Sequence, residues 1–299
     1  MKTTLILIKR NIKLFFKDKG MFFTSLITPT IILILYITFL GNIYKDSYTS
    51  SIPMGINVST SLIDGLVGGQ LISSILSVSC VTVAFSSNFL LVQDKANGAI
   101  KDLKISPINP SILSISYYIA SFISTLIILF VATSLCFVYL AFIGWYLSFI
   151  DVILLLIDVI LLSLFGTALS SIIYHFLSTQ GQISAISTIV SAAYGFICGA
   201  YMPIATFSES LQKIFLFLPG TYGTSLMRNH AMQGVLSEMN KQGIPLEITT
   251  NIKDSVDCNI YFFSEKINML TMYLVITLTI IVLICIYIGL NLMKKRSLR

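Results

Sequence analysis

Charged side chains are scarce in this chain of 299 residues, because Asp, Glu, Lys and Arg make up only 11% of it and hydrophobic residues make up 56%. A soluble domain carries roughly 25% charge, so the composition excludes an ordinary water-soluble protein. Motifs for chemistry are lacking as well. The chain has no G-x-x-x-x-G-K-[ST] nucleotide-binding loop, and no Ser/His/Asp or paired-carboxylate arrangement suggests an active site. We therefore expect a membrane protein that is not itself an enzyme.

Cysteine and histidine are also few, with five and two residues. Four of the cysteines fall inside apolar runs, which leaves Cys258 alone in the largest polar segment and excludes an intramolecular disulfide there. His175 and His230 lie far apart and have no cysteine near them in the sequence. We expect no metal site and no cofactor.

What the chain does have is six apolar runs of membrane-spanning length. A bilayer core takes about 20 helical residues at about 1.5 Å each. The sequence therefore predicts an all-α polytopic membrane protein with six transmembrane helices, over residues 21–40, 68–92, 112–143, 147–174, 183–204 and 267–293.

The basic residues predict the orientation of these spans. Of the 19 Lys and Arg residues, 13 lie in residues 1–20, in residues 93–111 or after residue 293. Six crossings place these three segments on one side, and the positive-inside rule makes that side cytoplasmic. Both termini are then cytoplasmic and residues 205–266 lie outside. The net charge of +6 reflects this topology and gives no case for nucleic-acid binding.

The N-terminal segment, residues 1–20, has the pattern of an amphipathic helix. Placed on a helix at about 100° per residue, its apolar side chains fall in one arc beside an arc of lysines: Leu5, Ile8, Ile12, Phe15 and Phe16. Such a helix can lie in the membrane interface, in contact with lipid. The alternative is a basic flank that only anchors the first span.

The loop over residues 93–111 is longer than a connection needs, since helix–helix links take about two to eight residues. It holds three Lys, two Asp, one Gly and two Pro between uncharged spans. We expect a short surface helix over residues 94–105, ended by Pro107 and Pro110 because proline cannot continue a helix. Its apolar side would be Ala99, Ile100 and Leu103. A solvated connecting loop fits the local chemistry equally well.

A family resemblance decides between these readings. The run Gly-Ala-Ile-Lys-Asp-Leu-Lys-Ile-Ser-Pro, residues 98–107, resembles the cytoplasmic loop of ABC-2 type exporter permeases, which has Gly-Thr, then Leu, then Ser/Thr-Pro before the third span. Met202-Pro203 and the Leu-Pro-Gly-Thr-Tyr of residues 218–222 also resemble that family. Ala99 and Lys101 depart from its usual Thr and Glu.

The resemblance implies the permease subunit of an ATP-driven exporter in a bacterial plasma membrane, working with a separate ATP-binding subunit and a second permease, identical or paralogous. The loop would be a coupling helix that docks on the ATPase, and residues 207–218 and 219–232 would be outer re-entrant helices. The residues that it implies for ATPase coupling are Asp94, Lys95, Gly98, Lys101, Asp102, Ser106 and Pro107.

Within the spans, Asp158 is the clearest candidate for function, because a carboxylate at membrane depth is costly. It either contacts substrate or accepts a hydrogen bond from a Ser or Thr on a neighbouring helix. Tyr194, Phe196 and Tyr201 either line a substrate path or pack in the bundle.

Gly195-x-x-x-Gly199 permits close helix approach, either between two permeases or within the chain. The substrate itself, a drug, peptide, lipid or glycan, is not readable. The rival function is a six-helix secondary transporter or channel without an ATPase, although no internal repeat supports it.

Overall fold

The computed structural model describes residues 2–53, 57–106, 108–262 and 265–296 of the chain, and it is almost entirely helical. The first half contains α1 (Lys2–Lys17), α2 (Lys19–Leu35), a π-helical turn (Tyr36–Leu40), α3 (Gly41–Ser51), α4 (Thr60–Ser87), α5 (Phe89–Ala96), α6 (Ala99–Ile105) and α7 (Pro110–Ile143). The second half contains α8 (Phe149–Phe176), α9 (Gln180–Ile197), a 3-10 turn (Ile204–Thr206), α10 (Glu209–Leu216), α11 (Pro219–Lys241), α12 (Leu246–Ser255), the short strands β1 (Tyr261–Phe262) and β2 (Glu265–Lys266), and α13 (Met269–Arg296).

Five helical stretches within the described residues are long and apolar enough to cross a membrane: Lys19–Ser50, Thr60–Ala96, Pro110–Ile143, Phe149–Phe176 and Met269–Met293. They coincide with five of the six predicted spans. The remaining span, predicted over residues 183–204, is helical only as α9, which begins with Gln180 and Gln182 and ends at Ile197. At about 1.5 Å per residue, this helix falls just short of a bilayer core of about 30 Å.

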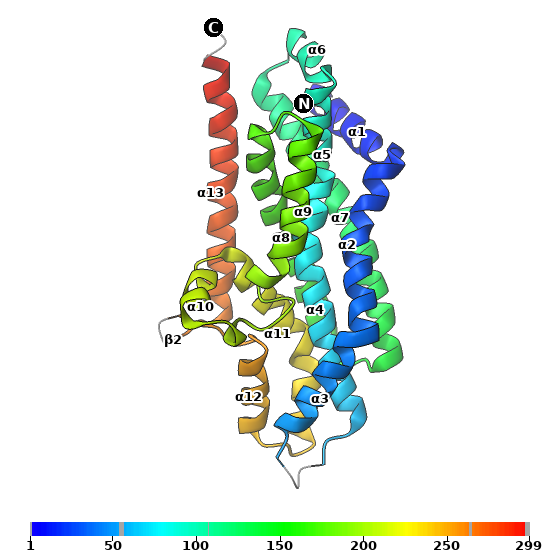
Figure 1. Ribbon diagram of the computed structural model, residues 1–299, viewed down its shortest axis with the longest axis vertical. Helices are drawn as coiled ribbons and strands as arrows, with labels where there is room; N and C mark the ends of the chain where they lie inside the picture. The colour runs from blue at the N-terminus through cyan, green and yellow to red at the C-terminus, as the bar shows by residue number, and fades with distance from the viewer. Residues whose placement is uncertain (1, 54–56, 107, 263–264, 297–299) are drawn as a thin grey trace.

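Helix α4 forms the centre of the bundle, and the other helices surround it (Figure 1). It packs against α2, α7, α8, α9 and α11, and nearly all of its residues from Leu62 to Ser87 are buried. By contrast, α2 and α13 leave large apolar side chains exposed along their length, including Ile27, Ile31, Leu274 and Leu278. An apolar exterior around a packed centre is what a membrane-spanning bundle requires, because lipid solvates those side chains.

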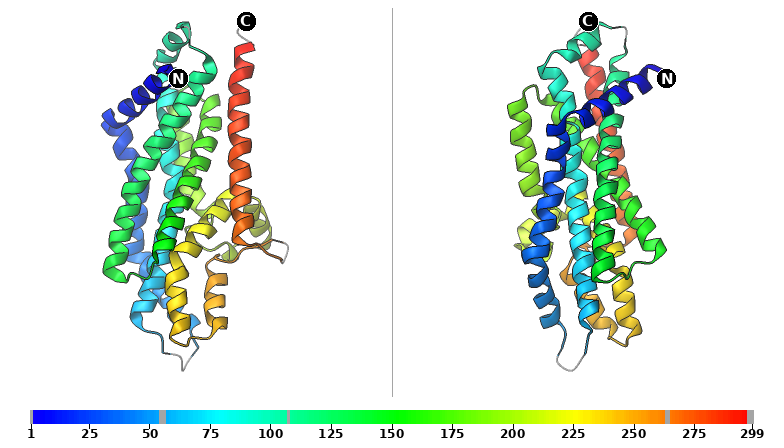
Figure 2. Two further views of the ribbon diagram at one scale, coloured as in Figure 1. Left: turned by 180° about the vertical axis from the view of Figure 1, so that it is seen from behind. Right: turned by 90° about the vertical axis from the view of Figure 1, so that its right-hand side faces the viewer.

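The two ends of the bundle differ in construction. The N-terminus, α6 and the C-terminal end of α13 lie at one end, while α3 and α12 lie at the other (Figure 2). Helix α1 crosses the first end obliquely and packs against α7. It buries Leu7, Asn11 and Phe15 and leaves Leu5 and Ile6 exposed, so its apolar residues divide between the bundle and the surroundings.

The opposite end has a hydrophobic core of its own. It joins Tyr48 near the end of α3 and Leu66 of α4 to Leu236 of α11 and to Ile248 and Ile252 of α12. The segment after α9 therefore contains more than the two helices predicted over residues 207–218 and 219–232. Its first helix, α10, buries no side chain, whereas α11 is mostly buried and continues to Lys241.

Candidate functional site

The loop predicted as a coupling helix is a hairpin of two helices, α5 and α6, rather than one helix over residues 94–105. Gly98 breaks it, because its φ of 81° lies in the left-handed region that glycine adopts without strain. A Cβ at residue 98 would meet no atom within 4 Å. Glycine is thus needed here for its backbone angle, and crowding plays no part.

Helix α6 presents two different sides. Ile100 and Leu103 pack against the core of the bundle, as the sequence predicted, while Lys101 and Asp102 are exposed. Ile105 was not singled out by the sequence pattern, yet it is 84% exposed at the end of the helix. Ser106 follows in extended conformation, and Pro107 lies outside the described residues.

Asp94, predicted to contact an ATPase, is buried inside the chain at the end of α5. Its Oδ2 accepts hydrogen bonds from Arg10 Nη1 at 2.7 Å and from the Tyr117 hydroxyl at 2.5 Å. Burial alone would lower the pKa of Arg10, but the hydrogen bond to Asp94 and its charge outweigh this and raise that pKa. The contact joins α5 to α1 and α7.

Lys95, the next residue, makes its contacts on the other side of α5. Its Nζ donates to the backbone carbonyls of Tyr174 at 2.7 Å, His175 at 2.9 Å and Leu177 at 3.0 Å. The last carbonyls of a helix have no partner within it, and a cation there also complements the helix dipole. Lys95 therefore caps α8 where the chain turns toward α9.

Asp158 lies 2% exposed between three helices. Its Oδ2 lies 2.6 Å from His230 Nδ1 on α11, and its Oδ1 accepts a hydrogen bond from the Tyr273 hydroxyl on α13 at 2.7 Å. The sequence predicted either a substrate contact or a hydrogen bond from a Ser or Thr on a neighbouring helix. The partners that the structure shows for Asp158 are a His and a Tyr. Neither could be found from the sequence, because both lie far along the chain on other helices.

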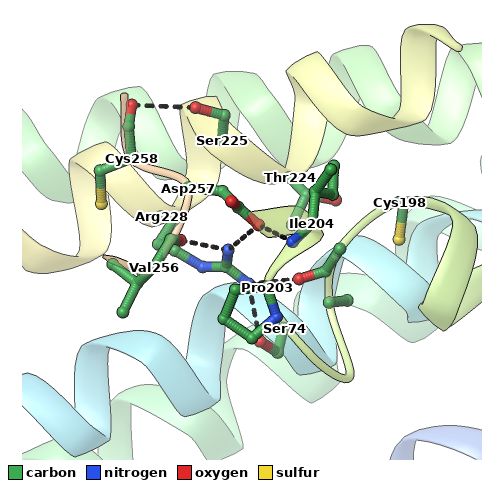
Figure 3. A network of polar contacts seen from close by, with 12 residues as sticks. Ser74, Cys198, Pro203, Ile204, Thr224, Ser225, Arg228, Val256, Asp257 and Cys258 are labelled. Carbon is green, nitrogen blue, oxygen red and sulfur yellow. Dashed lines mark hydrogen bonds and ion pairs between the residues drawn. The ribbon is translucent and has the colours of Figure 1, made fainter. Parts of the chain in front are cut away.

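A second buried network surrounds Arg228, which is 1% exposed and escaped the sequence analysis (Figure 3). Its guanidinium donates to the carbonyl of Val256 and, at 2.9 Å, to that of Gly199. It also lies 3.6 Å from Asp257 Oδ2, which accepts a 2.7 Å hydrogen bond from the Ile204 N–H. Burial raises the pKa of Asp257, against the opposing effect of Arg228.

This network connects parts of the chain that are distant in sequence. It joins α11 to the turn after α9 and to residues 256–258, and Arg228 Nη2 reaches Ser74 of α4 at 3.4 Å. The same turn is held from the π-helical turn and from α3, because the Tyr36 hydroxyl donates to the Ala200 carbonyl and the Tyr44 hydroxyl to that of Tyr201. Buried polar contacts thereby fix the turn after α9 to the surrounding segments of the bundle.

A comparison with protein families finds that the model of the ABC-2 type transporter family matches residues 2–231. The chain belongs to that family. As a member, it is the permease subunit of an ABC transporter, a membrane component that is not itself the ATPase. No curated protein matches the chain. Asp257 and α13, which complete the two buried networks of this permease, lie beyond the matched residues.

The remaining predicted residues of the permease lie around the turn after α9. Tyr194 is buried and Phe196 is 45% exposed. The ring of Tyr201 covers Gly195, where a Cβ would come within 2.3 Å of it, and a Cβ on Gly199 would lie 3.0 Å from Ile204. Both glycines therefore permit a close approach within the chain.

Proposed function

We propose that this permease is part of an exporter driven by a separate ATP-binding subunit, which docks on α6. The exposed end of α6 is the main support for this proposal. Ile105 is 84% exposed there, beside the exposed Lys101 and Asp102, while Ile100 and Leu103 pack on the bundle. An apolar side chain ringed by charges suits the centre of a protein interface. Lipid is a poor partner for it, because Lys101 and Asp102 flank it.

Helix α6 is connected to the bundle through α5, so movement of α6 would be transmitted to the helices that α5 contacts. Helix α5 continues from α4 and carries Asp94 and Lys95, which attach the hairpin to α1, α7 and α8. A subunit that pushes on α6 therefore acts on three elements at once. In this proposal Asp94 and Lys95 transmit the motion, and Lys101, Asp102, Ser106 and Ile105 meet the ATPase.

The orientation that this requires has the α6 end in the cytoplasm of a bacterial cell, with both termini there. The concentration of Lys and Arg in residues 1–20 and 93–111 supports it. A second permease completes the complex. Of the residues predicted to line a substrate path, Phe196 is the most exposed, at 45%, whereas both oxygens of Asp158 contact His230 and Tyr273.

The test is co-purification of the ATPase with variants of α6. Ile105→Asp should lose the bound ATPase, because a carboxylate replaces the apolar contact. Lys101→Glu should reduce binding only modestly, since an exposed ion pair contributes about 0–1 kcal/mol. The matched control is Leu246→Asp, a change of an aliphatic side chain that is 71% exposed on α12 at the other end. Retention of the ATPase by Ile105→Asp, or equal loss in the control, would refute docking on α6.

A further inference from the structure

A pocket of about 380 Å³ lies at the end of the bundle that carries α12, between the α7–α8 turn and α11. Its lining includes Trp145 of the turn, Asp151 of α8, and Gln233, Ser237, Glu238 and Lys241 of α11. None of these residues takes part in the coupling hairpin or in the two buried networks. Pockets that hold small ligands measure about 300–1,000 Å³, so its size suits a small ligand or the head of a larger one.

Glycine and a capping box build this pocket. A Cβ at Gly234 would lie within 1.9 Å of the Tyr146 carbonyl oxygen, so the turn can rest directly on α11 only because residue 234 has no side chain. Ser148 caps the N-terminus of α8 and donates from both its N–H and its Oγ to Asp151 Oδ2, at 2.9 and 2.7 Å. These contacts hold the carboxylate at the pocket wall.

One carboxylate oxygen of Asp151, Oδ1, accepts no hydrogen bond from Ser148. Both hydrogen bonds from Ser148 go to Oδ2, and Oδ1 receives none from the residues that the structure describes, although it is not sealed from solvent. The residue as a whole is only 7% exposed. A carboxylate with little water around it forms stronger charge-assisted hydrogen bonds than one in bulk solvent.

We propose that this pocket binds an organic ammonium group, with Asp151 as its principal anion. Ser237 and Glu238 of α11 line the same space and add oxygen acceptors. Trp145 supplies an aromatic surface of the kind that attracts organic cations. Lys241 is 75% exposed and lies 3.6 Å from Glu238, so it stands at the rim, where it meets any anionic group on the same ligand.

Two sources carry this chemistry at a membrane surface. One is a small organic ammonium ion in the medium, such as choline or protonated ethanolamine, and the other is the head group of an ethanolamine lipid, whose phosphate would reach Lys241. The site is separate from the docking of an ATPase on α6, so binding is measured on the permease alone.

The chain offers its own reporter, because Trp145 is its single tryptophan. Choline and ethanolamine are titrated into detergent-purified permease, and permease in nanodiscs of phosphatidylglycerol is compared with permease in nanodiscs that also contain phosphatidylethanolamine. We expect a saturable change of Trp145 fluorescence in at least one arm. A response confined to nanodiscs with phosphatidylethanolamine assigns the lipid as the source.

The variants decide whether the carboxylate is responsible. Asp151→Asn keeps an oxygen for the Ser148 cap and should weaken binding about tenfold or more, as expected when a hydrogen bond to a charged group is lost. Glu238→Gln on the rim should weaken it less and serves if Asp151→Asn fails to fold. Glu247→Gln, at an exposed acid of α12 outside the pocket, should bind as wild type. No saturable response in any arm, or one unchanged in Asp151→Asn and Glu238→Gln, would overturn the proposal.

Discussion

Arg228 is a buried residue that joins three other segments of the chain to α11. Its guanidinium contacts the turn after α9, residues 256–257 and α4, and almost none of it is open to solvent. Removing one partner of a buried ion pair leaves the other charge uncompensated and costs about 3–5 kcal/mol. Replacing both partners costs much less, because no unpaired charge remains.

We therefore predict that Arg228→Met lowers the unfolding midpoint of the purified permease sharply. Adding Asp257→Asn to it should recover much of the loss. Lys213→Met, at an exposed position on α10, is the matched control and should change little. Thermal unfolding followed by circular dichroism in detergent measures all four proteins. If the double variant is as unstable as Arg228→Met, the ion pair is not the cause.

At the scale of elements, the contact that matters is between the α5–α6 hairpin and the end of α8. Lys95 is the residue that makes it, through three carbonyl acceptors. A hydrogen bond to a charged group contributes about 1.5–3 kcal/mol, so loss of this cap should loosen the α8–α9 turn.

The prediction is that Lys95→Met increases hydrogen–deuterium exchange in residues 174–183 without removing the ATPase from α6. Lys101→Met, at an exposed lysine of the same hairpin, should leave exchange there unchanged. Mass spectrometry of the peptides across the α8–α9 turn gives the result. Equal protection in Lys95→Met and wild type would show that the hairpin is not mechanically joined to α8 through this side chain.

At the scale of the whole molecule, hydropathy located five helices long and apolar enough to cross a membrane, and charge suggested their direction, because both depend on segments about 20 residues long. Pairing between segments is a different kind of information. Asp158 was recognisable as costly, but His230 and Tyr273 lie 72 and 115 residues away and nothing local marks them. The same holds for Arg228 and the turn at Gly199.

Local backbone chemistry also limited the prediction at the coupling loop. The break at Gly98 follows from its left-handed φ, and glycine in a sequence allows that angle without requiring it. Asp94 and Lys95 looked like free surface charges, because their partners Arg10 and the end of α8 approach only in the folded bundle. The apolar side of α6 was predictable, since Ile100 and Leu103 follow helical spacing.

The central claim is that α6 docks on an ATP-binding subunit, and photocrosslinking from residue 105 tests it most directly. Ile105→p-benzoylphenylalanine is expressed in the native cell and irradiated, with Leu246→p-benzoylphenylalanine as the control at the other end of the bundle. We predict an adduct between residue 105 and a protein that carries a nucleotide-binding P-loop, identified by mass spectrometry, and no such adduct from residue 246. Adducts of residue 105 with lipid alone, or with the same ATPase from residue 246, would contradict it.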